Sequence, residues 1–160
     1  MTWISSSRRS PQSSPAAEPA DVAERRLLAL VVVEDPLVRQ LVRRNLEALR
    51  IPGPVEKSGF TVVEMETGRA ALSILSAVSP ELVVVDLGLS ELSGYEFCER
   101  LRASGGLQHV PLLAISSRAM PQDRAAAEEV GVTAFLSKPF TPRQLIEQVV
   151  PLVTASAGER

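Results

Sequence analysis

Five short runs of aliphatic residues, each followed by a longer stretch with apolar residues at helical spacing, constrain the fold of this chain more than any other feature. The third run, at 82–86, reads LVVVD, four aliphatic residues followed by a carboxylate. Unbroken runs of this kind are typical of strands that are buried on both faces. Their alternation with helices predicts an α/β domain in the (βα)5 doubly wound arrangement, with a five-stranded parallel sheet between two layers of helices.

The expected elements follow from periodicity and from residues that begin or end helices. Asp35 followed by Pro36 is a helix N-cap pattern, and the sequence Ile51-Pro-Gly-Pro54 cannot continue the helix that begins there. The expected strands are 27–33, 60–64, 82–86, 111–115 and 132–137, and the expected helices are about 36–50, 68–78, 95–103, 122–130 and 142–152.

Composition divides the chain into a domain and two tails. Residues 1–25 are rich in Ser, Pro, Arg and Ala and are predicted to be a flexible tail, because they offer too little apolar surface to fold. The domain is expected at 26–153, followed by a short C-terminal tail at 154–160. No continuous apolar stretch follows Arg8 and Arg9, and no segment is apolar over roughly 18 residues, so neither a secretory signal nor membrane insertion is expected.

Charge and cysteine content exclude several classes of function. A net charge of −2, 4% aromatic residues and the lack of a basic stripe on any expected helix argue against nucleic-acid binding. The single cysteine, Cys98, excludes an intrachain disulfide and a multi-cysteine zinc site, and its helical position predicts a core residue. A reducing compartment, the cytoplasm, is the expected location.

Polar side chains gather at the carboxyl ends of the expected strands, where function is concentrated in parallel sheets. Carboxylates that share a crevice repel one another unless a divalent cation neutralises them, and oxygen ligands suit Mg²⁺. A free carboxylate beside a metal, a hydroxyl and an ammonium predicts a phosphoryl-transfer site that forms an acyl phosphate. The residues are Glu34, Asp35, Asp86, Ser116, Ser117 and Lys138, one of only two lysines against 15 arginines.

Three linked motifs carry a resemblance to a known family. They are LVVVDLGLSELSG (82–94), PLLAISS (111–117) and GVTAFLSKPF (131–140). In order and spacing they resemble the response-regulator receiver domains of two-component signalling, over about residues 27–153. The resemblance implies a flavodoxin-like strand order of 2-1-3-4-5.

The resemblance also implies roles for individual residues. Asp86 matches the phosphorylated aspartate, Ser116 the hydroxyl that bonds the phosphoryl group, and Phe135 the aromatic switch position. Lys138 matches the lysine that precedes a proline, here Pro139, whose peptide bond is usually cis in the family. The implied Mg²⁺ ligands are Glu34, Asp86 and the backbone carbonyl of Gly88, with Asp35 as a further candidate.

The chain departs from the family pattern in three places. Val33 stands where receivers usually carry an acid, and Glu34 replaces the direct metal ligand with a longer side chain, so weakened Mg²⁺ affinity is expected. Residues 51–58 form an insertion, interpreted as a surface loop. Ser90 replaces a common proline and is expected to loosen the loop after Asp86 slightly.

The function expected from these features is that of a stand-alone receiver without turnover on an external substrate. Asp86 would take a phosphoryl group from a sensor histidine kinase or a phosphotransfer protein. Because no recognisable output domain follows Leu152, the signal is expected to pass by contact with a downstream protein through the face formed by the last two helices and the last strand. A homodimer is left open. The alternative, motivated by Val33, is a pseudo-receiver that binds proteins independently of phosphorylation.

Overall fold

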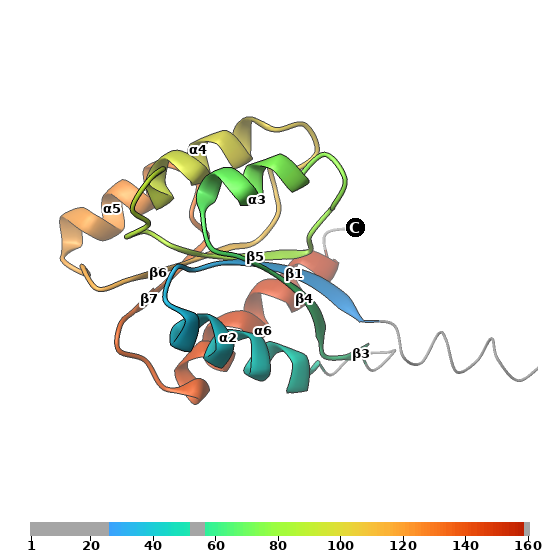
Figure 1. Cartoon of the computed structure of the whole chain (residues 1–160). Coiled ribbons are helices and arrows are strands. Elements are labelled where there is room, and N and C mark those ends of the chain that lie inside the picture. Colours follow the sequence, from blue (N-terminus) through green and yellow to red (C-terminus); the bar gives the residue numbers. More distant parts are fainter. Residues whose placement is uncertain (1–25, 52–56, 159–160) are drawn as a thin grey trace, which may run out of the picture.

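The computed structural model describes residues 26–51 and 57–158, and shows one parallel sheet with helices on both sides (Figure 1). The sheet has the order β4-β1-β5-β6-β7, which is 2-1-3-4-5 when only its five strands are counted. This confirms the expected fold class and strand order. The sheet strands are β1 (Leu27–Val32), β4 (Phe60–Met65), β5 (Leu82–Asp86), β6 (Leu112–Ser116) and β7 (Ala134–Ser137).

Helices cover each face of the sheet unequally. In Figure 1, α3 (Gly68–Ile74), α4 (Gly94–Ala103) and α5 (Pro121–Glu129) lie on one face of the sheet, and α2 (Pro36–Ala48) and α6 (Pro142–Gly158) lie on the other.

Side-chain alternation along the strands builds a separate core on each face. In β1, Leu30 and Val32 pack in the cluster that contains Phe97 and Cys98 of α4. Their neighbours Ala29 and Val31 pack in the cluster on the opposite face, with Leu46 of α2. A strand that is buried on both sides needs apolar residues at every position, which explains the unbroken aliphatic runs.

Cys98 is fully buried in the first of these cores, as its helical position predicted. Burial raises the pKa of its thiol to about 12, so the thiol stays protonated near neutral pH. A buried, protonated thiol is a packing residue rather than a nucleophile.

Two helices end at different places from those expected. The last helix, α6, does not stop near Leu152 but continues to Gly158 and contains the exposed Pro151. It therefore runs past the proposed domain boundary at residue 153. In contrast, α3 ends at Ile74 rather than Val78. The expected tail at 1–25 lies outside the described residues.

The insertion after α2 begins and ends in paired strands, whereas a surface loop was expected. Strand β2 (Arg50–Ile51) pairs with β3 (Lys57–Ser58) in antiparallel register, and residues 52–56 lie outside the described part. Ile51 is buried. Gly59, which follows β3, has φ of 73° and comes so close to α2 that an added Cβ would lie 2.1 Å from the Glu47 carbonyl oxygen.

Candidate functional site

Asp86 is the centre of the candidate site. It is the last residue of β5, the middle strand of the sheet, and only 6% of its surface is exposed. Its Oδ2 lies 2.6 Å from Lys138 Nζ, and its Oδ1 accepts a hydrogen bond of 2.8 Å from the Gly88 backbone N–H. A buried carboxylate is therefore paired with one ammonium and one backbone donor, as burial of a charge requires.

Lys138 reaches Asp86 because β7 and β6 hold the chain beside β5. The Lys138 backbone N–H donates to the Ser116 carbonyl at 2.8 Å, which extends the β6–β7 ladder beyond Ser137. The peptide bond between Lys138 and Pro139 is cis, as the resemblance implied. The predicted meeting of Asp86 and Lys138 across 52 residues is confirmed.

Ser116, rather than Ser117, is the buried hydroxyl of the pair at the end of β6. Ser116 is 5% exposed, and its Oγ accepts a hydrogen bond of 3.0 Å from the Arg118 backbone N–H, whereas Ser117 is exposed. A cavity of about 440 Å³ opens beside this residue, and its lining includes Gly88, Arg118 and Tyr95. This cavity has no signal in the sequence, because it forms between two loops that are separated along the chain.

Tyr95 adds a neutral polar group to the wall of that cavity. Burial, with a smaller contribution from the charge of Asp123, raises the pKa of Tyr95. The phenol therefore keeps its proton and is available as a hydrogen-bond donor.

A close approach between α4 and the strand end keeps the loop after Asp86 compact. An added Cβ at Gly94 would lie 2.4 Å from Leu87 Cα and 2.6 Å from the Asp86 carbonyl oxygen. Only glycine allows the first turn of α4 to pack this closely against the backbone of the site.

The expected meeting of three carboxylates is not found. Within residues 26–51 and 57–158, no group of three or more His, Cys, Asp or Glu side chains could hold a metal ion. Asp35 is exposed, and its Oδ1 accepts a hydrogen bond of 2.9 Å from the Leu37 backbone N–H, which makes it the N-cap of α2. Of the two roles expected for Asp35, the structure shows the cap.

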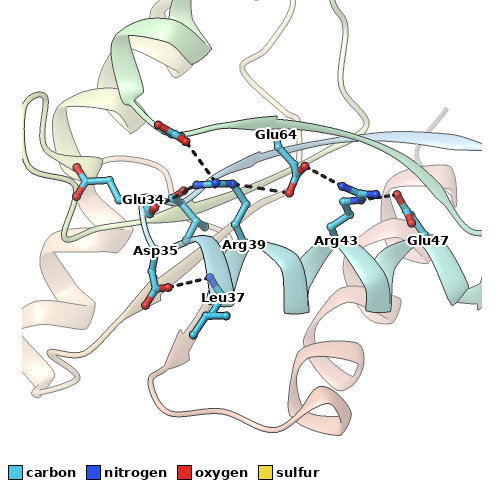
Figure 2. Close-up of polar contacts among 9 residues, drawn as sticks. Glu34, Asp35, Leu37, Arg39, Arg43, Glu47 and Glu64 are labelled. Carbon is cyan, nitrogen blue, oxygen red and sulfur yellow. Dashed lines mark hydrogen bonds and ion pairs between the residues drawn. The ribbon is translucent and has the colours of Figure 1, made fainter.

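Val33 is fully buried on the α2 and α6 side of the sheet, where it continues the alternation of Ala29 and Val31. The position that usually carries an acid in receivers is thus part of the core. Arg39 holds the backbone beside it, since its Nη1 donates to the carbonyl oxygens of Val33 at 2.8 Å and Glu34 at 3.1 Å (Figure 2).

Glu34 is held by the loop after β5. Its Oε1 accepts hydrogen bonds from the Ser90 backbone N–H at 2.7 Å and from the Ser90 hydroxyl at 2.5 Å. These two bonds lower the pKa of Glu34 and keep it ionised. The expectation that Ser90 loosens this loop is wrong, because a proline there would lack the N–H that Ser90 donates.

The donor atoms present fit a hard divalent cation. The Asp86 and Glu34 carboxylates each accept a hydrogen bond from the same loop, Asp86 from Gly88 and Glu34 from Ser90, and the Gly88 carbonyl belongs to that loop as well. Each carboxylate oxygen has a second lone pair, and Glu34 Oε2 makes no hydrogen bond or ion pair with any residue that the structure describes. An all-oxygen set of this kind matches Mg²⁺, with fewer carboxylates than expected.

Phe135 lies on β7, opposite Ala114 of β6, and is half-buried. The Arg124 guanidinium of α5 stands 4.6 Å from the centre of its ring. The ring also borders a groove of about 290 Å³ that reaches Gln148 of α6. Phe135 thus lies at the surface that α5, β7 and α6 form together.

Comparisons with known proteins agree with this geometry. The family model described as the response regulator receiver domain matches residues 29–150. The chain is 34% identical over 154 residues to the alkaline phosphatase synthesis transcriptional regulatory protein SphR of Synechococcus elongatus, covering 91% of this chain and 53% of that protein. It is 28% identical over 121 residues to the polar-differentiation response regulator DivK of Brucella ovis, covering 76% of this chain and 92% of that protein.

Coverage differs between these relatives. The chain spans about half the length of SphR and of the response regulator MprA of Mycolicibacterium vanbaalenii, but most of DivK. The match to the first two therefore concerns a part of each protein.

Solved structures show the same fold. A CheY-like response regulator receiver domain protein from Methanospirillum hungatei superposes with a TM-score of 0.73 at 18% identity, covering 85% of this chain and 100% of that chain. The receiver domain of a sensor histidine kinase from Pseudomonas aeruginosa, with a magnesium ion coordinated in its active site cleft, gives 0.70 at 22% identity, covering 81% and 99%. With its family model, its fold and its paired Asp86 and Lys138, the chain belongs to the response regulator receiver domain family.

Proposed function

We propose that this chain is a phosphoacceptor receiver in which Asp86 takes a phosphoryl group from a phosphohistidine of a kinase or phosphotransfer protein. The observation that carries the proposal is the buried Asp86 carboxylate with Lys138 Nζ at 2.6 Å. An Asp86 oxygen attacks phosphorus, the P–N bond of the donor breaks, and the electron pair leaves with the imidazole nitrogen, which then takes a proton. The product is an acyl phosphate on Asp86.

The neighbouring residues would secure this product. Lys138 carries a compact positive charge that can pair with an oxygen of the phosphoryl group. Ser116 of the neighbouring strand β6 supplies a buried hydroxyl that can bond a second phosphoryl oxygen. A divalent cation held by Asp86, Glu34 and the Gly88 carbonyl would neutralise charge on the transferring group when bound. The proposed ligand set contains one carboxylate fewer than the usual receiver pattern because Val33 is apolar, which supports the proposal of weakened Mg²⁺ affinity.

Signalling would pass by protein contact rather than by turnover on an external substrate. Phe135 supports this part of the proposal, because it contacts Arg124 of α5 and borders the groove that reaches α6. Phosphorylation adds negative charge at Asp86, at one end of the sheet. The proposed contact surface lies on α5, β7 and α6, so the added charge would have to change the arrangement of these elements. Among the described residues, no helix is long and apolar enough to cross a bilayer.

The test is phosphorylation by acetyl phosphate, read as a band shift on a phosphate-affinity gel and as added mass. Wild type should be modified with Mg²⁺ and unmodified with EDTA, and Asp86→Asn should be unmodified in both. Ser79→Ala, an exposed change in the loop before β5, is the matched control and should behave as wild type.

The second candidate is a pseudo-receiver that binds its partner without phosphate. The buried Val33 and the missing third carboxylate favour it. Unmodified wild type under conditions that modify a known receiver, together with unchanged partner binding by Asp86→Asn, would establish this alternative and reject the phosphoacceptor.

A further inference from the structure

The contact between Glu34 and Ser90 joins the two loops that flank the candidate metal site. Glu34 follows β1 and Ser90 lies in the loop between β5 and α4, 56 residues further along the chain. Both donors of Ser90, the backbone N–H and the hydroxyl, point to the same oxygen of Glu34. Glu34 Oε1 therefore accepts both hydrogen bonds, and Glu34 Oε2 is left for another partner.

Other contacts hold Glu34 at its base, so that Ser90 decides where its carboxylate lies. Arg39 Nη1 fixes the carbonyl oxygens of Val33 and Glu34, and Asp35 is occupied as the cap of α2. Figure 2 shows the Glu34 side chain extending away from the Arg39 guanidinium and its glutamate partners. The long side chain of Glu34, exposed to solvent, would otherwise sample several rotamers.

The loop that contains Ser90 is itself anchored at the phosphoacceptor. The Gly88 backbone N–H donates to Asp86 Oδ1 at 2.8 Å, two residues before Ser90. Ser90 therefore links the second carboxylate to the same short segment that carries Asp86 and the Gly88 carbonyl. Hydrogen bonds of this kind orient metal-binding carboxylates in other sites, and their loss weakens metal affinity.

We propose that Ser90 is a positioning residue that holds Glu34 Oε1, so that Glu34 offers only Oε2 to a divalent cation. The proposal rests on the proposed function, in which Glu34 and Asp86 share that cation. Ser90 compensates in part for the apolar Val33, because a long glutamate that is fixed in one rotamer loses less entropy on binding than a free one.

The experiment is a titration of the full chain with Mn²⁺, in which free Mn²⁺ is measured by electron paramagnetic resonance. Ser90→Ala removes the hydroxyl and should raise the Kd about 10-fold, whereas Ser90→Thr keeps both donors and should bind as wild type. Ser79→Ala is the matched serine control and should also bind as wild type. Thermal unfolding of each variant checks that it is folded.

A double-mutant cycle shows whether Ser90 acts through Glu34. In the Glu34→Gln background, Ser90→Ala should cause no further weakening, because the ligand that it positions is already lost. An equal effect of Ser90→Ala in both backgrounds, tighter binding by Ser90→Ala, or no Mn²⁺ binding by wild type would each overturn the proposal. Phosphorylation of Asp86 is not part of this readout, so normal Mn²⁺ binding with an unmodified Asp86 would reject the proposed function alone.

Discussion

Two ion pairs of this protein, Lys138–Asp86 and Arg143–Glu147, differ in how much they contribute to its stability. Lys138 and Asp86 meet at 2.6 Å, with side chains 26% and 9% exposed. Arg143 and Glu147 meet at 3.0 Å on α6, with side chains 88% and 58% exposed. Solvent screens the second pair, so that it adds little to stability, whereas Asp86 without Lys138 would be a buried charge that lacks a counter-ion.

We therefore expect Lys138→Ala to lower the free energy of unfolding by about 2 kcal/mol, because a hydrogen bond to a buried charged group is lost. Arg143→Ala should lower it by less than about 0.5 kcal/mol. Urea unfolding at pH 7 measures both. Equal losses in the two variants would show that burial of Asp86 does not strengthen its pairing with Lys138.

Helix α2 on one face of the sheet and helix α4 on the other each begin with a side chain that accepts a backbone N–H of the first turn. Asp35 accepts from Leu37 at the start of α2, and Ser93 accepts from Glu96 at the start of α4. Each cap satisfies a donor that has no partner within its helix. At Asp35 the cap gives a carboxylate beside the candidate metal site a structural role, and its part in binding a cation stays a prediction.

We expect Asp35→Ala to lower the free energy of unfolding by about 1 kcal/mol, the usual loss for an N-cap. Asp35→Asn should keep the stability, since the amide oxygen can accept the same bond. Neither change should alter the Kd for Mn²⁺. A weaker Kd in both variants would identify Asp35 as a ligand and contradict its assignment as a cap alone.

The whole molecule depends on one sheet that serves two cores. Phe97 is fully buried with the α3, α4 and α5 helices, and Leu46 is fully buried with α2 and α6. Neighbouring residues of each strand contribute to opposite cores, so neither core can form without the strands that build the other. This arrangement predicts a single cooperative unit.

Phe97→Ala should lower the free energy of unfolding by about 3–5 kcal/mol, and Leu46→Ala by about 2–5 kcal/mol. Because the cores share the sheet, each variant should still unfold in one transition, with equal calorimetric and van't Hoff enthalpies. Differential scanning calorimetry measures both quantities. Two resolved transitions in either variant would show that the cores unfold independently.

Several features of the protein follow from its sequence alone. The aliphatic runs and helical spacings predicted the alternating elements and the parallel sheet, because both patterns are local and repeat with the period of the backbone. The carboxyl ends of parallel strands must share an edge, which brought Asp86 and Lys138 together in the prediction as they are in the structure. Local patterns predicted helix ends less well: α6 was expected to end near Leu152, but it contains Pro151 and continues to Gly158.

Only the tertiary structure decided how the acids are used. Glu34 bonds Ser90 across 56 residues, Asp35 turns to its own helix, and Val33 enters the core behind α2. The pairing of β2 with β3 likewise depends on residues 57 and 58 lying beside residues 50 and 51 in space. The physical reason is the same in each case: a side chain's partner depends on which loops meet in space and on the rotamer that it adopts there, and neither is encoded in the local pattern of residues.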